Sequence, residues 1–478
     1  MKSAVSQSGS DRASHSIVMD GVDDALASLQ QQPFQLDPVQ EQFRAQLGLP
    51  TDVPIVMSGH QPGFWHMGIV AKVLAMHDLA HQHNAQPVWV VVDQDTLTSS
   101  QLISLRLPVV TNGTIDVLSW DLDTPGAART MLDANRPLCL VPSLQSVSTA
   151  PDAGTINTER IKASLERHKG ESSIAMQFTL AAMDVIYEWI DAITGTSTQR
   201  PIVIPATALA RTDLFSSIVQ RMTADPDRCI HAYNNATRIA PKAKMRPLDI
   251  ASQELPIWSI DAKQGRVPVH AADLSPGTSR TPMQLAPRAL LMTQMLRIAG
   301  CEAFIHGLGG GEYEHIGDAW FSQWKQYFND PNPWIVTSAT VTPISASFVQ
   351  TNGLHVSPAS ISNALTLPHR AANNPALLGN DTLQMQKQEL VKKINAAKHQ
   401  GSQAERAAMF RELREIVQSA AASAEAQQQL AHTADNAAQA RAKQRSVELA
   451  HNRTFPFFVY SRDTLRELHS LIHTRITT

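Results

Sequence analysis

Residues 54–68 read Pro-Ile-Val-Met-Ser-Gly-His-Gln-Pro-Gly-Phe-Trp-His-Met-Gly, and this stretch decides the fold. A short apolar run from Pro54 to Met57 stops abruptly at small and polar residues. Apolar residues then recur at helical spacing, at Ile69, Val73, Leu74 and Met76. The pattern predicts a strand over 54–57, a tight turn, and a helix over 67–83.

A second buried strand is predicted over 87–92, and it runs directly into Asp93-Gln94-Asp95. Consecutive strands joined by a helix lie parallel, and open parallel sheets bind ligands at the carboxyl ends of their strands. We therefore expect an α/β fold with a Rossmann-like parallel sheet. Its first two strand ends should present polar side chains to one site.

The turn after the first strand has the chemistry of an anion site. Glycines let the backbone approach a ligand closely, and a helix start offers N–H groups and a positive dipole end. Histidines beside it would donate to phosphate or carboxylate oxygens. Carboxylates would orient an amine or a ribose hydroxyl, or act as a general base. The candidate catalytic residues are His60, His66, Asp93 and Asp95, and the candidate binding residues are Gly59, Gln61, Gly63 and Lys72.

A second glycine-rich block follows another apolar run, at 302–315: Glu-Ala-Phe-Ile-His-Gly-Leu-Gly-Gly-Gly-Glu-Tyr-Glu-His. The pattern again predicts a strand, a glycine-rich turn and a helix, with backbone N–H groups open to a ligand. We expect this block to form the opposite wall of the site. Its candidate binding residues are His306, Gly309, Gly310, Gly311, Glu312 and Tyr313.

Both blocks resemble the BshC family, the cysteine ligases of bacillithiol biosynthesis. Residues 58–64, Ser-Gly-His-Gln-Pro-Gly-Phe, resemble the family's Thr-Gly-Gln-Gln-x-Gly-Leu, with His60 standing where the family has Gln. Residues 87–96 resemble its Phe-Trp-x-x-x-Glu-Asp-His-Asp, with Asp-Gln-Asp-Thr in place of the acidic cluster. Gly310-Gly311-Glu312 is similar to its Gly-Gly-Pro-Gly-Glu-Ile.

The resemblance covers about residues 50–330. It implies a nucleotidylyltransferase-like Rossmann core with a helical coiled-coil appendage, and a ligase that joins an amino acid, cysteine in the family, to an amino-sugar conjugate. The sequence identifies no cofactor, and the superfamily makes a nucleotide the candidate. An alternative stays open: a BshC-like protein without that activity, serving as a nucleotide- or anion-binding module or as a different nucleotidyl- or acyl-transferring enzyme.

The composition narrows the class of protein. The chain has 478 residues, 43% of them hydrophobic and 17% charged, which is typical of two or three globular domains. A net charge of −3 indicates no nucleic-acid partner, and three scattered cysteines indicate neither a disulfide framework nor a zinc ribbon. With no secretory h-region and no apolar run of membrane-spanning length, we expect a cytoplasmic protein with small-molecule substrates.

A metal site was weighed for the same strand ends. His60, His66, Asp93 and Asp95 offer nitrogen and oxygen ligands for a divalent ion. Their spacing matches no dedicated motif, so we assign no metal.

Composition shifts predict the domain plan. We expect a homodimer through the C-terminal hairpin, because its alanine-rich second helix extends past the first and would otherwise lack cover. The predicted parts are a disordered or loosely helical 1–45 and a core over 46–355 with insertions near 155–200 and 240–280. A linker over 356–380 and a helical hairpin or coiled coil over 381–450 follow. The last segment, 451–478, should return to the core through the apolar patch 455–460.

Overall fold

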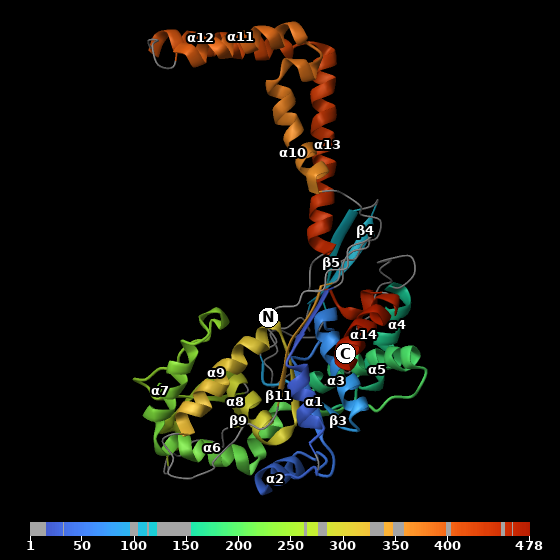
Figure 1. The fold of residues 1–478 in the computed structure, drawn as a ribbon, viewed down its shortest axis with the longest axis vertical. Helices are drawn as coiled ribbons and strands as arrows, with labels where there is room; N and C mark the ends of the chain where they lie inside the picture. The colour runs from blue at the N-terminus through green and yellow to red at the C-terminus, as the bar shows by residue number, and fades with distance from the viewer. Residues whose placement is uncertain are drawn as a thin grey trace. The chain divides into compact units, whose positions relative to one another are not determined.

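The computed structural model describes residues 16–31, 33–95, 104–111, 114–121, 154–261, 265–275, 284–325, 339–347, 358–397, 403–450, 455–460 and 462–478. The chain forms two compact units (Figure 1). The first comprises residues 1–109, 117–349 and 453–478, and the second comprises 110–116 and 350–452. None of the helices in the described ranges has both the length and the apolarity that a bilayer-spanning segment needs.

A six-stranded sheet lies at the centre of the first unit, in the order β1-β11-β10-β2-β3-β6. All neighbours pair in parallel except β1 and β11, which are antiparallel. Numbered along the chain, the parallel strands run 3-2-1-4-5, so the order reverses between β2 and β10. This confirms the predicted parallel α/β sheet. The strands are β1 (Ser16–Asp20), β2 (Ile55–His60), β3 (Gln86–Val91), β6 (Ile202–Pro205), β10 (Ala303–Gly307) and β11 (Ala339–Ser347).

Two hydrophobic clusters lie on the two faces of this sheet, because strand side chains alternate. Val56 and Trp89 belong to one cluster, while Met57 and Val90 belong to the other. α3, α5 and α14 cover the first face, and α6, α7, α8 and α9 cover the second. The helices of this unit are α1 (Val22–Leu29), α2 (Pro38–Gln46), α3 (Met67–Gln82), α4 (Gly154–Arg167), α5 (Ile174–Thr194), α6 (Asp213–Ala224), α7 (Pro226–Thr237), α8 (Ala289–Met295), α9 (Leu308–Lys325) and α14 (Arg462–Thr477).

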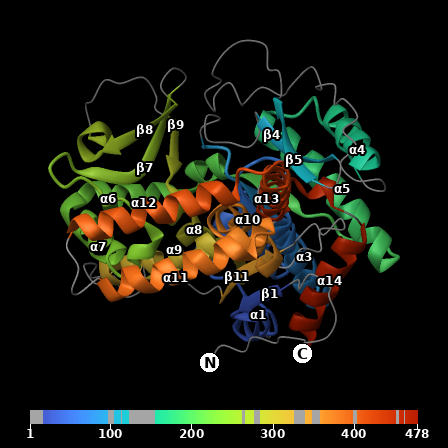
Figure 2. The same cartoon turned by 90° about the horizontal axis from the view of Figure 1, so that it is seen from above.

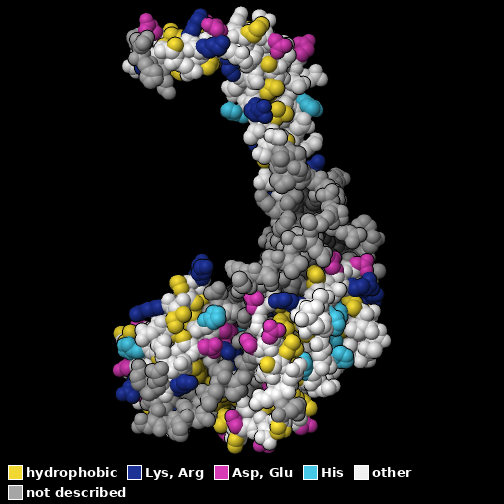
Figure 3. Space-filling model, in the orientation of Figure 1, with side chains coloured by type: hydrophobic (Ala, Val, Ile, Leu, Met, Phe, Trp, Pro, Cys, Tyr) yellow, Lys and Arg dark blue, Asp and Glu magenta, His cyan; other side chains and the backbone are white. Residues whose placement is uncertain are grey.

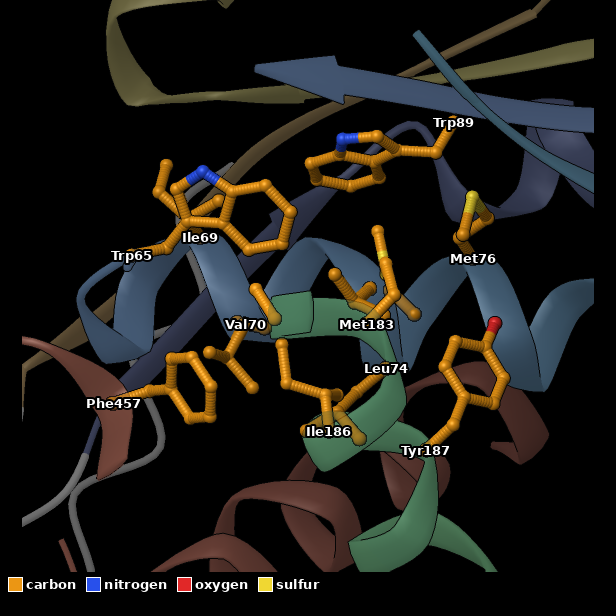
Figure 4. Close-up of a cluster of buried hydrophobic side chains, with 14 of the residues drawn as sticks. Trp65, Ile69, Val70, Leu74, Met76, Trp89, Met183, Ile186, Tyr187 and Phe457 are labelled. Atoms are coloured by element: carbon orange, nitrogen blue, oxygen red, sulfur yellow. The ribbon is translucent and has the colours of Figure 1, made fainter. Parts of the chain in front are cut away.

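Figure 4 shows the first cluster, where Val70 and Leu74 of α3 meet Ile186 of α5. The indoles of Trp65 and Trp89 close one end of it, with ring centroids 4.9 Å apart. Phe455, Phe457 and Phe458 are fully buried in the same cluster, so the C-terminal segment belongs to this core. α5 lies between β3 and β6 in the chain and packs in this core. The prediction that 155–200 is an insertion is therefore wrong for α5.

The predicted helical character of the N-terminus is present as α1 and α2, while disorder is wrong for the strand over 16–20 and for α2, which is packed into the core. β1 pairs with β11 along the sheet edge, and Phe43 and Arg44 of α2 are fully buried. Arg44 forms an ion pair with Glu302, and the backbone N–H of Ile55 also donates to that carboxylate. α2 therefore lies against the start of β2 and β10.

An inserted three-stranded antiparallel sheet, in the order β8-β7-β9, follows α7 (Figure 2). We call it the inserted sheet. It consists of β7 (Glu254–Asp261), β8 (Gly265–His270) and β9 (Gln284–Pro287). A further two-stranded sheet pairs β4 (Ser104–Thr111) with β5 (Thr114–Asp121).

The second unit consists largely of α10 (Pro358–Asn373), α11 (Asp381–Ala397), α12 (Gln403–Ala420) and α13 (Ala424–Ala450). α11 contacts α12, and α10 contacts α13 (Figures 1 and 2). The predicted linker over 356–380 is wrong, because most of it is α10. The alanine-rich α13 therefore has a cover within the chain, and this removes the physical reason for the homodimer. The coiled coil and the dimer stay predictions.

The surface of this unit carries basic and acidic side chains interspersed (Figure 3). Met385 of α11 and Phe410 of α12 are large exposed hydrophobic side chains among them. A mixed-charge surface of this kind is typical of a solvated helical arm.

Candidate functional site

The ends of β2 and β10 meet where the strand order reverses, which is where doubly wound sheets bind ligands. Ser58 pairs with Ile305 in register, and its hydroxyl donates to the Ile305 carbonyl at 2.8 Å. β2 continues to His60 and β10 to Gly307. A Cβ on Gly59 would lie 2.6 Å from the carbonyl oxygen of Val90, so only glycine fits at this position. The two predicted walls are thus adjacent.

Lys72 of α3 spans both strand ends. Its Nζ donates to the carbonyl of Gly59, and a Cβ on Gly307 would lie 3.9 Å from its Cδ. The ammonium also lies 5.4 Å from the centre of the Trp89 ring. The residue is only 4% exposed, and this burial lowers the pKa of Lys72 to about 7. Lys72 therefore exchanges its proton near neutral pH, as a catalytic amine must.

His60 is neutral at pH 7. Burial, with the nearby charge of Lys72 and a smaller effect of His66, lowers the pKa of His60 to about 3, although the Gln61 carbonyl opposes the shift. The Nδ1 of His60 lies 3.1 Å from that carbonyl, which places the proton on Nδ1 and leaves Nε2 as an acceptor. A pKa of about 3 makes the ring a weak base, and the predicted role of His60 as a donor to an anion stays a prediction.

His66 is the N-cap of α3. Its Nδ1 accepts a hydrogen bond of 3.0 Å from the backbone N–H of Gly68. One of the amides that we expect to bind an anion at this helix start is thus already bonded within the chain. In the neutral ring the proton therefore lies on Nε2.

Asp93 is bound to the neighbouring strand end. The backbone N–H of Thr207 donates to its Oδ1 at 3.0 Å, and the Thr207 hydroxyl donates to its Oδ2. Burial raises the pKa of Asp93, and the Thr207 bonds oppose that shift. Asp93 therefore ties the end of β3 to the end of β6, and its role in orienting a substrate or acting as a general base stays a prediction.

Asp95 faces the inserted sheet. Its Oδ1 lies 2.7 Å from Nη2 of Arg266 on β8, and Gln61 donates to its Oδ2 at 3.2 Å. Gln61 and Asp95 are thus brought together, as the predicted site requires. Arg266 was not among the sequence candidates, because nothing local in a short edge strand marks it.

The second glycine block forms the first turn of α9, which begins at Leu308 directly after β10. The separate glycine-rich turn that the pattern predicts is therefore absent from this part of the described chain. A Cβ on Gly310 would lie 2.6 Å from His306 Nδ1, so this glycine makes room for the imidazole. Tyr313 is exposed. Gly309 and Gly311 lie in the same turn, and the side chain of Glu312 is outside the described residues.

His306 points into a buried charge network that the sequence reading missed. Its Nε2 lies 2.8 Å from Oε1 of Glu314, and Glu314 is also paired with Arg297. Arg297 pairs in turn with Asp318 at 2.6 Å. Burial raises the pKa of Glu314, but the charges and hydrogen bonds of His306 and Arg297 outweigh it and lower that pKa to about 2.

Two glycines make this network possible. Gly310, Glu314 and Gly317 stand at i, i+4 and i+7 on α9, and so lie on one face of the helix. A Cβ on Gly317 would lie 2.4 Å from Nε2 of Gln294, which donates to Glu314 at 3.4 Å. This Gly-x3-Glu-x2-Gly spacing is the sequence signal that could have identified the network.

A metal ion has no evident site. Among the described residues, no group of three or more His, Cys, Asp and Glu side chains is arranged to hold one. The four candidate metal ligands do not form one group, because Asp93 is bonded to Thr207 and Asp95 is paired with Arg266.

Comparisons with known proteins assign no family. No family model matches the chain, and no curated protein matches it. Among solved structures, the chain is similar to a tyrosyl-tRNA synthetase complexed with L-tyrosine from Archaeoglobus fulgidus, at 8% identity and a TM-score of 0.26. That match covers 72% of this chain and 73% of the other. At this score it carries no argument, and the strand order alone defines the fold.

Proposed function

We propose that the chain is a BshC-like ligase, which joins the carboxyl group of an amino acid to an amino-sugar conjugate at the ends of β2 and β10. The observation that carries this proposal is Lys72, a buried amine with a pKa of about 7 between the two strand ends. Forming an amide from an activated carboxyl group places negative charge on the acyl oxygen, breaks the bond between the acyl carbon and its activating group, which leaves, and releases a proton from the amine. The protonated form of Lys72 suits the first task, and its unprotonated form, which a pKa of about 7 makes available, suits proton removal from the amine.

A second candidate is a BshC-like protein that binds a nucleotide or another anion without ligase activity. Asp93 favours it, because both oxygens of this carboxylate accept hydrogen bonds from Thr207. The acidic cluster of the family thus has one of its counterparts here in a structural role.

Low-molecular-weight thiol profiling separates the two candidates. A deletion strain is analysed by mass spectrometry for amino-sugar conjugates and their cysteine adducts. It is then complemented with the wild type, with Lys72→Met, or with Lys169→Met. Lys169→Met is the control, because the side chain of Lys169 is more than half exposed. If the chain is this ligase, the deletion strain should lose the cysteine adduct and accumulate the unmodified conjugate. The wild type and Lys169→Met should restore the adduct, and Lys72→Met should not. An unchanged thiol pool in the deletion strain would leave the second candidate.

A further inference from the structure

Lys72 is the cation of the proposed reaction, but its charge depends on pH near neutrality, and the histidines at the strand ends supply no permanent charge. The ring of His60 is neutral, His66 caps its own helix, and Lys72 exchanges its proton near pH 7. An arginine keeps its charge throughout this range. Arg266 of the inserted sheet reaches Asp95, directly beyond the end of β3.

We propose that Arg266 binds the oxyanion of the substrate, a phosphate or a carboxylate, and that Asp95 occupies its guanidinium until the oxyanion displaces it. This inference rests on the proposed function, because it names the anion-binding group of the same site. It assigns Asp95 a role opposite to the one expected from the sequence. Asp95 competes with the ligand instead of binding it.

Contacts place Arg266 beside the turn that follows β2. Nη2 of Arg266 lies 2.7 Å from Oδ1 of Asp95, and the other oxygen of Asp95 accepts from Gln61 at 3.2 Å. Gln61 follows His60 directly in the chain. The guanidinium is thus connected through two polar contacts to the residue that follows His60.

Trp258 of β7 orients the guanidinium. The Cζ of Arg266 lies 5.2 Å from the centre of the Trp258 ring, within the range of a cation–π interaction. Arg288 packs on the same ring at 3.9 Å, but its Nη2 binds Glu254 at 2.7 Å and its Nε binds the Ile257 carbonyl. Arg288 is therefore fixed within the inserted sheet, while Arg266 points from the sheet toward the strand ends.

The partial exposure of Arg266 and Asp95 allows a ligand oxyanion to replace Asp95 at the guanidinium. The side chain of Arg266 is 29% exposed and that of Asp95 is 19% exposed, so solvent reaches both partners of the pair. Ion pairs that solvent reaches contribute little net stability. A guanidinium fork that binds a phosphate or carboxylate through two hydrogen bonds is one of the stronger charge-assisted contacts. A ligand oxyanion can therefore displace Asp95.

Isothermal titration calorimetry of the full-length protein tests this assignment. Pyrophosphate and L-cysteine are the two probes, one for a phosphate source and one for a carboxylate source. Arg266→Gln should weaken binding of at least one probe by about 10- to 100-fold. Asp95→Asn should strengthen binding of the same probe by about two- to fivefold, because it removes the competing charge. Arg200→Gln is the matched control, since Arg200 pairs with Asp191 at the same 2.7 Å distance.

The outcomes separate the two proposals. If the wild type binds a probe and Arg266→Gln binds it equally well with an unchanged melting temperature, the role of Arg266 is wrong while the site stands. If Asp95→Asn weakens binding, Asp95 contacts the ligand and the competition is wrong. If the wild type binds neither probe, the assignment of Arg266 and the proposed ligase both fail. Arg266→Lys should keep the charge but not the fork, and so retain binding only in part.

Discussion

Replacing Glu314 by Gln should destabilise the first unit by about 3 kcal/mol. Glutamine keeps the shape of the side chain but removes the charge that faces Arg297 and His306. Breaking a buried ion pair by removing one partner costs about 3–5 kcal/mol. Asp318, which is 44% exposed, still pairs with Arg297 and should recover part of that cost. The lowering of the Glu314 pKa from 4.5 to about 2, which the same two partners cause, corresponds to a similar value of about 3 kcal/mol.

Urea denaturation followed by tryptophan fluorescence measures this effect. All tryptophans of the sequence fall within the ranges of the first unit, and Trp320 and Trp324 lie on α9 itself. Because the folded-state pKa is depressed, the contribution of Glu314 is complete above pH 4.5 and declines as the pH falls toward about 2. The difference between wild type and variant should therefore shrink through this window.

Asp318→Asn is the control, since its partly exposed carboxylate should contribute only about 0–1 kcal/mol. Equal small effects of Glu314→Gln and Asp318→Asn would refute the reasoning. So would a difference between wild type and Glu314→Gln that stays constant from pH 6 to pH 2. In either case the buried network would be incidental to stability.

Three further substitutions test separate parts of the structure. In the wild type, the unfolding free energy should rise by up to about 1.4 kcal/mol per pH unit between pH 7 and pH 10.5, because the folded state has already released the Lys72 proton that the unfolded chain still holds. Urea titrations of Lys72→Met should lack this rise. Gly59→Ala should lower stability by about 1–3 kcal/mol in thermal unfolding, since the new Cβ meets the Val90 carbonyl, whereas Gly170→Ala, with nothing within 4 Å, should be near neutral. Ala371→Asp should separate α10 from α13 and reduce the helical circular dichroism, whereas the exposed neighbour Ala372→Asp should not; equal spectra would contradict the pairing.

Local patterns were enough to predict the strand, turn and helix at the first site. The apolar run before Gly59 and the helical spacing after Met67 are short-range signals, and β2 and α3 follow them within a few residues. The same holds for β3, and for the strand and the helix at β10 and α9, although the predicted glycine-rich turn between them is the first turn of α9. Parallel order then follows from the crossover connections, so the switch point between β2 and β10 was predictable in outline.

Long-range pairing was not predictable from such patterns. β1 is five residues long, and its partner β11 lies more than 300 residues further along the chain. α10 contains Pro368 and a mixture of Ser, Asn and Ala, which is typical of a linker until the packing against α13 is known. In both segments tertiary contacts override a weak local propensity.

The chemical roles of the site residues depend on partners that the sequence does not place side by side. Asp93 and Asp95 are two residues apart and look equivalent in the sequence. Thr207 binds Asp93 and Arg266 pairs with Asp95, so the first ties two strand ends together and the second occupies the guanidinium that we propose for the ligand. The same argument applies to His60, which the buried Lys72 beside it helps to keep neutral. A strand-end motif therefore predicts where chemistry occurs, while burial and cross-strand partners determine which residues perform it.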